Sequence, residues 1–162
     1  MDMRRSSSGI SPVVATVILV AIAIVIAIAV AFWASGLVGV FTRFEKIEVT
    51  AAVYDTTNHD IELLVRNTGS SPATIDNIYV NGQPVGSNNF NLLTQDGDVV
   101  ELPADAQTCS VNNTMATCDP GEYVIISLTG AAGGAAFQHG VTYEVAVHTA
   151  SGKLYPVSVQ IP

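Results

Sequence analysis

The stretch that decides the fold is residues 13–31, VVATVILVAIAIVIAIAVA, in which Thr16 is the single residue other than Val, Ala, Ile or Leu. No charged side chain occurs between Arg5 and Arg43. A helix of roughly 20 apolar residues crosses a hydrocarbon core about 30 Å thick, and this stretch has that length. The Ala-Ile alternation within it is typical of a strand, but a lone strand in lipid leaves its backbone polar groups unpaired. The stretch therefore predicts a membrane-spanning helix.

The residues before this helix predict where it begins and how it is oriented. Ser11 followed by Pro12 fits an N-cap and a first helical position, where the missing proline N–H costs nothing. Arg4 and Arg5 should stay in the cytoplasm by the positive-inside rule, which places the rest of the chain outside.

The apolar character extends beyond one bilayer. It continues past Phe32 and Trp33 to about Phe44, and a helix over 12–49 would be on the order of 55 Å long. The excess apolar surface needs a partner other than lipid, for which neighbouring copies of the same helix are the simplest candidate. The glycines of segment 36–39 indicate either a close helix contact or a kink or helix end before a linker.

Composition divides the chain into two parts. Charged residues make up 12% of the 162 residues, and the mean hydropathy is +0.42. Residues 1–42 carry a net charge of +1, whereas residues 43–162 carry −9, for a total of −8. An acidic body repels phosphate backbones, so we expect no nucleic-acid partner.

The C-terminal part has the pattern of an all-β domain. From residue 47 onward apolar and polar residues alternate with a period of two. This pattern predicts short strands at 47–54, 61–66, 73–80, 99–102, 123–128, 141–148 and 154–160. Asn81-Gly82 and Ser151-Gly152 predict hairpin turns, and segment 130–140 predicts a loose connection. The expected fold class is α+β, mainly β: a long apolar α-helix followed by an immunoglobulin-like antiparallel β-sandwich.

The segment before the helix contains a processing motif. Residues 4–9 read RRSSSG and residues 10–13 read ISPV. A secretory signal has a shorter apolar region with a cleavage site after it, so the alternative is cleavage before the apolar run, between Gly9 and Ile10. With a basic leader ending in glycine, a Ser-Pro-Val start and a long apolar helix, the chain resembles the archaeal type IV pilins, which carry a class III signal peptide and form a superfamily with the archaellins.

The resemblance implies a life cycle for the chain. Prepilin peptidase would remove residues 1–9 by cutting after Gly9, leaving Ile10 as the mature N-terminus in the cell membrane. An assembly ATPase and a membrane platform protein would then move the helix, residues 10–46, into the core of a helical homo-oligomer, with residues 47–162 displayed outside the cell. The side chains expected to pack in the filament core are Val13, Val17, Val20, Ile24, Ile28, Phe32, Trp33 and Phe41.

The two cysteines and one glycosylation sequon lie close together. A disulfide between Cys109 and Cys118 is the favoured interpretation in an oxidising exterior, against two free thiols or a metal site. Asn112-Asn113-Thr114 is the one N-x-S/T sequon, which makes Asn112 a glycosylation candidate.

We find no catalytic or metal-binding motif, so the chain is not expected to be an enzyme or to need a cofactor. His59, His139 and His148 are widely spaced, and no G-x-S-x-G motif or phosphate-binding loop occurs. Asp96-Gly97-Asp98 lacks the EF-hand spacing and is interpreted as a solvated acidic loop rather than a calcium site.

Three functions remain open. The first is a structural pilus subunit for adhesion, with an archaellin as a sibling. The second is an uncleaved, membrane-anchored β-sandwich that binds an S-layer or serves as an archaellum stator component. The third is an extracellular solute- or sugar-binding module, for which the sequence marks no site.

Overall fold

The computed structural model describes residues 11–41, 43–131 and 134–162, and it divides into two compact units, Met1–Thr42 and Arg43–Pro162. The first unit holds one long helix. The second unit is a β domain.

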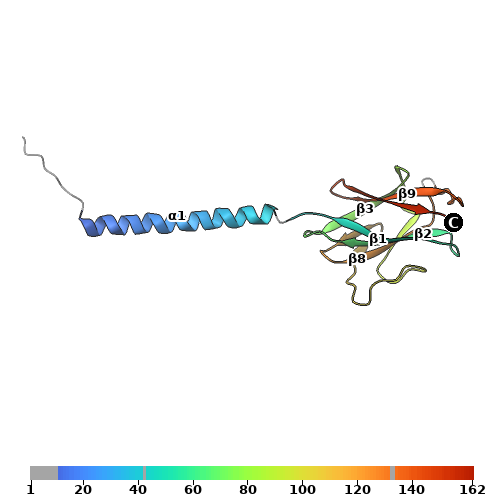
Figure 1. Cartoon of the computed structure of the whole chain (residues 1–162), viewed down its shortest axis with the longest axis horizontal. Helices are drawn as coiled ribbons and strands as arrows, with labels where there is room; N and C mark the ends of the chain where they lie inside the picture. Colours follow the sequence, from blue (N-terminus) through green and yellow to red (C-terminus); the bar gives the residue numbers. More distant parts are fainter. Residues whose placement is uncertain (1–10, 42, 132–133) are drawn as a thin grey trace, which may run out of the picture. The chain divides into compact units, whose positions relative to one another are not determined.

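Helix α1 spans Pro12–Phe41 (Figure 1). It begins at the expected residue, because Pro12 needs no N–H partner in the first turn and the Ser11 carbonyl accepts the N–H of Ala15 at 3.1 Å. The helix ends at Phe41, earlier than the expected residue 46 and well short of residue 49.

The helix stops where backbone groups of the next segment are bound by the β domain. The Phe44 carbonyl accepts the N–H groups of Ser70 and Ser71, and the Lys46 carbonyl accepts those of Thr68 and Gly69. These carbonyls are therefore unavailable for helical bonds. Glycine is needed at position 69, because a Cβ there would stand 2.6 Å from the Lys46 nitrogen and from the Phe44 oxygen.

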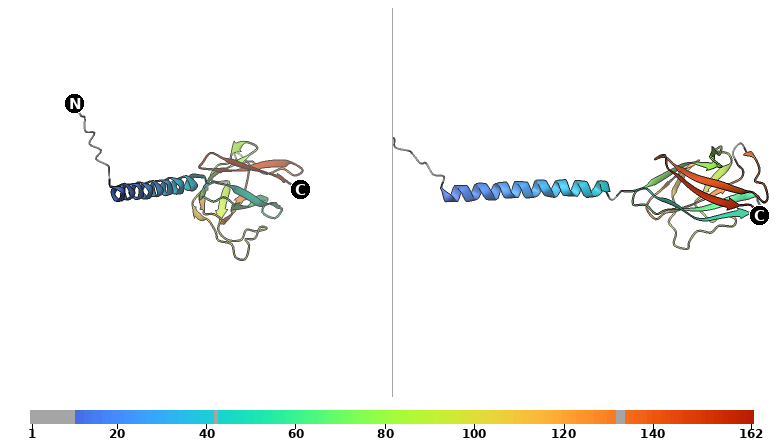
Figure 2. Two further views of the ribbon diagram at one scale, coloured as in Figure 1. Left: turned by 60° about the vertical axis from the view of Figure 1, so that its left-hand side comes forward. Right: turned by 45° about the horizontal axis from the view of Figure 1, so that its top comes forward.

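The β domain consists of two antiparallel sheets packed face to face (Figures 1 and 2). One sheet has the order β1-β2-β8-β5, and its strands are Ile47–Asp55, Asp60–Asn67, Tyr123–Leu128 and Phe90–Leu93. The other has the order β10-β9-β3-β7-β6, with strands Leu154–Gln160, Thr142–Thr149, Ala73–Val80, Met115–Cys118 and Ser110–Asn112, and the short β4, Gln83–Pro84, also pairs with β3. The expected mainly β fold with a two-sheet sandwich is confirmed.

The core lies between the two sheets. Alternate residues of the central strands β2 and β8 are fully buried and meet buried residues of β3 and β9. The largest of these side chains are Ile61, Leu63, Ile75, Ile78, Ile126, Leu128 and Val145. Burying each such side chain contributes about 1.5–3 kcal/mol, so the sandwich supplies its own stabilising core.

Both predicted hairpins are present. Asn81 and Gly82 have φ angles of 50° and 76°, as a type I′ turn requires, and they connect β3 to β4. Gly152, with φ of 82°, lies in the turn between β9 and β10.

The strand predicted at 99–102 is wrong. This segment is a loop over the outer face of the first sheet, where Val100 packs with Leu64 and Ile125. Its N–H groups bond to side chains instead of to a neighbouring strand. The N–H groups of Val99 and Val100 both donate to the Glu62 carboxylate. Strands β5, β6 and β7 lie outside the predicted segments, whereas β4 is the second arm of the hairpin predicted at Asn81-Gly82.

Candidate functional site

The surface of helix α1 is the first candidate site. The window Pro12–Leu37 is long and apolar enough to cross a membrane, and none of it is buried within the structure. Seven of the eight residues expected in a filament core are available for contact, with exposed fractions between 51% for Ile28 and 76% for Phe32; the others are Val13, Val17, Val20, Ile24 and Trp33.

The helix is apolar on every side. Val13, Val17 and Ile24 follow the helical spacing of one face. Ile22 and Ile26 lie on the opposite face and are 50% and 56% exposed. A helix without a polar face belongs in lipid or inside an assembly of helices.

The hydroxyl groups in the helix are satisfied by the helix itself. Thr16 Oγ1 donates to the Val13 carbonyl at 2.8 Å, and Ser35 Oγ donates to the Ala31 carbonyl at 2.8 Å. Because each hydroxyl has an acceptor within the helix, neither requires water. This arrangement avoids the free-energy cost of leaving a hydroxyl without a hydrogen bond in lipid or in a dry helix bundle.

Sequence reasoning missed a row of small residues on the helix. Ala23, Ala27, Ala31, Ser35 and Gly39 recur every four residues, and the signal was present in their spacing. Residues four apart are neighbours on a helix surface, and because each step drifts by about 40° the row winds around the helix. Small side chains allow two helices to approach closely.

Three sequence-based assignments cannot be placed in the structure. Gly9 and Ile10, the expected processing site, lie outside the described residues. Phe41 ends the helix, but its side chain is outside the described part.

The disulfide between Cys109 and Cys118 is confirmed. It closes the β6–β7 hairpin, with the two Cα atoms 4.3 Å apart, and both cysteines are buried in the core of the sandwich. No free cysteine occurs in the described chain.

Asn112 lies at the tip of the same hairpin. It is exposed at the end of β6, directly before the turn formed by Asn113 and Thr114. Asn113 has a φ of 53°, a left-handed conformation that Asn tolerates better than most residues. The side chain of Asn112 is therefore accessible, and its glycosylation remains a prediction.

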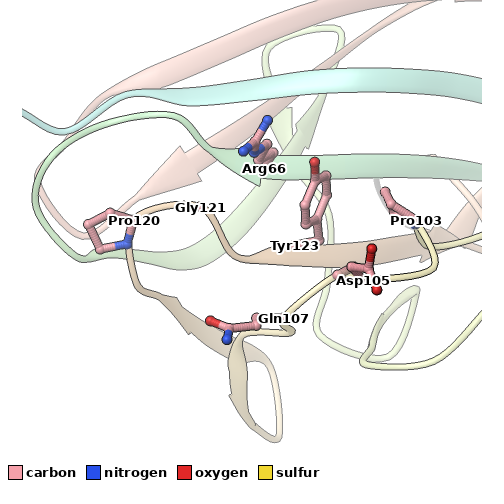
Figure 3. Close-up of a pocket in the computed structure, with 8 residues that line it drawn as sticks. Arg66, Pro103, Asp105, Gln107, Pro120, Gly121 and Tyr123 are labelled. Carbon is pink, nitrogen blue, oxygen red and sulfur yellow. The ribbon is translucent and has the colours of Figure 1, made fainter.

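A pocket of about 340 Å³ with both polar and apolar lining lies at one end of the sheet that contains β2 and β8 (Figure 3). Arg66, near the end of β2, lies over the ring of Tyr123, the first residue of β8, with its Cζ 5.0 Å from the ring centroid. Asp105 and Gln107 come from the loop before β6, and Pro103 and Pro120 form the walls. No local sequence signal indicates this pocket, because its parts lie far apart along the chain.

Several main-chain groups around the pocket are already paired. The Tyr123 N–H bonds to the Gln107 carbonyl at 2.9 Å, and the Tyr123 carbonyl accepts the Cys109 N–H at 3.0 Å. The Gly121 N–H bonds to the Asn67 carbonyl at 2.8 Å. At these positions a ligand would therefore meet side chains rather than free main-chain groups.

The acidic loop 96–105 is solvated at its carboxylates, as expected for Asp96-Gly97-Asp98, because Asp96 and Asp98 are exposed, while its backbone is anchored. Asp96 accepts the N–H of Leu102, Asp98 accepts from the side chain of Asn58, and Glu62 holds the backbone of the loop. Among the described residues, no three His, Cys, Asp or Glu side chains are placed to hold a metal ion.

A buried carboxylate lies beside this loop. Asp60 is 4% exposed, Oδ2 accepts a hydrogen bond from the Ser127 hydroxyl at 2.7 Å, and Oδ1 has no partner. Burial raises the pKa of Asp60, and repulsion from Glu62, Asp55 and Asp98 adds to this, against the lowering effect of the Ser127 hydroxyl.

The three histidines are not brought together. His148 Nδ1 lies 2.5 Å from Asp76 Oδ1, and His139 Nδ1 lies 2.7 Å from the Pro162 carbonyl. His59 is in the turn between β1 and β2, with a φ of 60°. The described residues therefore form no histidine-based catalytic group.

Comparison with known proteins finds similarity at the level of solved structures. No family model matches the chain, and no curated protein is detectably similar to it in sequence. The chain is similar to the archaellum periplasmic stator protein FlaG from Sulfolobus acidocaldarius, with 15% identity, a TM-score of 0.47, and coverage of 72% of this chain and 100% of that one. It is also similar to the archaellum periplasmic stator complex of FlaF and FlaG from the same organism, with 15% identity, a TM-score of 0.43, and coverage of 72% of this chain and 90% of that one.

A third similar structure is the Iho670 flagellar-like filament, with 14% identity, a TM-score of 0.41, and coverage of 93% of this chain and 98% of that one. Similarities at this level assign neither a family nor a role. The function of the chain has to be inferred from its own residues.

Proposed function

We propose that the chain is the structural subunit of an archaeal type IV pilus, an adhesion filament in which the helices pack into the core and the β domains face outward. The proposal covers cleavage after Gly9, a cytoplasmic N-terminus in the membrane-bound precursor and display of residues 47–162 on the cell surface. An assembly ATPase and a membrane platform protein would move the subunit from membrane to filament.

The observation that carries the proposal is the uniform apolar surface of helix α1. Its 30 residues, Pro12–Phe41, are about 45 Å long at 1.5 Å per residue, whereas a bilayer core is about 30 Å thick. A simple anchor needs no apolar surface beyond the bilayer. A subunit that exchanges lipid for neighbouring helices needs apolar contacts along its whole length and on every side.

The helix is also suited to leave the membrane. It carries no charged residue, and the hydroxyls of Thr16 and Ser35 remain bonded within the helix. Moving it from lipid into an apolar bundle therefore exposes no unpaired polar side chain. Packing between small residues, such as the row that includes Ala27 and Ala31, would supply the contacts that hold helices together.

The N-terminal peptide tests the proposal directly. Protein sheared from whole cells and protein left in the membrane are digested and compared by mass spectrometry. A peptide starting at Ile10 in the sheared fraction is the expected result. Met1 retained, with all of the protein in the membrane, would contradict processing and filament export.

A second candidate is an uncleaved, membrane-anchored β-sandwich protein, such as a stator or S-layer-binding component. It is favoured by the window Pro12–Leu37, which is sufficient by itself for one membrane crossing. The same fractionation distinguishes the two, because an anchored protein stays in the membrane. An archaellin would instead be processed and sheared like a pilin, and its deletion would abolish swimming rather than attachment.

A further inference from the structure

The pocket formed around Arg66 and Tyr123 has no part in filament assembly as proposed, yet its chemistry is that of a binding site. We propose that it binds a carboxylate-bearing sugar, such as a uronic acid unit of a surface glycan. Its volume of about 340 Å³ is at the small end of the range for ligand pockets, which suits a single sugar unit.

The first argument is the state of Arg66. It is exposed and makes no ion pair in the described part of the chain, although residues 43–162 carry a net charge of −9. An acidic domain repels anions over most of its surface, so an unpaired guanidinium provides a local point of attraction. The planar guanidinium also offers paired N–H donors that match the two oxygens of a carboxylate.

The second argument is the position of that guanidinium. Arg66 lies over the Tyr123 ring at 5.0 Å, a distance at which the ring quadrupole attracts the cation. The contact limits the conformations that Arg66 explores before a ligand arrives. Less side-chain entropy is then lost on binding.

The third argument concerns the neutral part of the ligand. The Asp105 carboxylate accepts hydrogen bonds from hydroxyl groups, and the Gln107 side chain both donates and accepts. Together with the Tyr123 hydroxyl, these groups provide the alternating donors and acceptors that a ring with several hydroxyls requires. Pro103 and Pro120, which lie at opposite ends of the view in Figure 3, add apolar surface to the lining.

A peptide fits this pocket less well. Peptides in extended form bind through main-chain hydrogen bonds, but the N–H groups of Gly121 and Tyr123 and the carbonyls of Gln107 and Tyr123 are already paired. At these positions recognition must therefore use side chains.

The test uses the full chain in detergent micelles and isothermal titration calorimetry. The probes are short oligomers of glucuronic acid and of galacturonic acid, a glucose oligomer of the same length, and a short acidic peptide. We expect at least one uronate oligomer to bind, and the glucose oligomer to bind roughly tenfold more weakly or not at all. Arg66→Gln should weaken uronate binding roughly tenfold, and Arg66→Lys should fall between it and the unaltered protein.

Lys46→Gln is the matched control, because it removes the same charge from another exposed position of the β domain and should leave binding unchanged. Gln107→Ala, on the exposed loop, provides a second variant that leaves the contact between Arg66 and Tyr123 intact and should also weaken binding. Failure of both uronates to bind, equal binding of the glucose oligomer, or selective binding of the peptide would each overturn the proposal. Unchanged uronate affinity in Arg66→Gln and Gln107→Ala would do the same.

Discussion

Gly97 lies directly against the carboxylate of Glu62, so close that a Cβ added at Gly97 would stand 2.5 Å from Oε2. The Glu62 side chain is 1% exposed and accepts the N–H groups of Asp98, Val99 and Val100 at 2.7–3.0 Å. A single side chain from the middle of β2 thus fixes a loop that covers the outer face of its sheet. Glycine at position 97 leaves the space that this approach requires.

Glu62→Gln should lower the free energy of unfolding by on the order of 3 kcal/mol. The amide keeps the size of the side chain but loses its charge, and its NH₂ group faces backbone N–H groups. Urea denaturation provides the measurement. Glu101→Gln, at an exposed carboxylate in the same loop, is the control and should change stability little. Equal stability of the two variants would contradict the role assigned to Glu62.

Asp60 should make stability fall as pH rises. Burial raises its pKa above the ordinary 3.8 in the folded state, so the folded protein holds the proton more tightly than the unfolded chain does. The destabilisation caused by ionising the buried Asp60 is absent below pH 3.8. It grows as the pH rises toward the folded-state pKa and is complete above that pKa. Asp60→Asn removes this contribution and keeps an acceptor for Ser127.

The measurement is the difference in unfolding free energy between the unaltered protein and Asp60→Asn, followed from about pH 3 to about pH 7. The variant should gain relative stability as the pH increases. Taking the difference cancels the groups that do not interact with Asp60. Asp55, whose pKa is lowered by the backbone N–H of Thr57, acts in the opposite direction and also repels Asp60, so part of its contribution remains. A difference that stays constant with pH would show that Asp60 has the same pKa in both states.

Replacing both Cys109 and Cys118 by Ala should lower the free energy of unfolding by roughly 2–3 kcal/mol, because the bridge closes a short loop in the unfolded chain. Intact mass should reveal two alkylated thiols after reduction and none before. Alkylation of the native protein without reduction would refute the bridge in cells.

Ile24→Asp should abolish filaments, because a carboxylate without a partner costs several kcal/mol in lipid or between apolar helices. Electron microscopy of sheared material gives the filament yield, and an immunoblot of the membrane fraction shows whether the precursor is made. Ile24→Leu, which keeps the apolar surface, should assemble normally. A normal yield from Ile24→Asp would count heavily against core packing.

The sequence predicted those elements whose signals are local. The start of the helix follows from a proline at the head of a long apolar run, and the turn at Asn81-Gly82 from two residues that accept positive φ. The sandwich class follows from the period of two and the regular turns. Each of these depends on residues adjacent in the chain.

The features that could not be predicted depend on distant partners. The apolar residues Val99 and Val100 resemble a strand, yet a carboxylate 37 and 38 positions earlier holds their N–H groups in a loop. The helix ends because the loop 68–71 binds the backbone after it. The pocket exists because β2 and β8 pair, which places Arg66 opposite Tyr123.

The segment after the helix has a mechanical consequence for a protein that is anchored or assembled through its N-terminal part. Tension entering the β domain at its first residues falls on the four main-chain hydrogen bonds that the Phe44 and Lys46 carbonyls accept from residues 68–71. It passes next into β1, which is paired with β2 from Ile47 to Asp55. The loop 68–71 therefore takes load at the point of attachment before the pairing of β1 with β2 does.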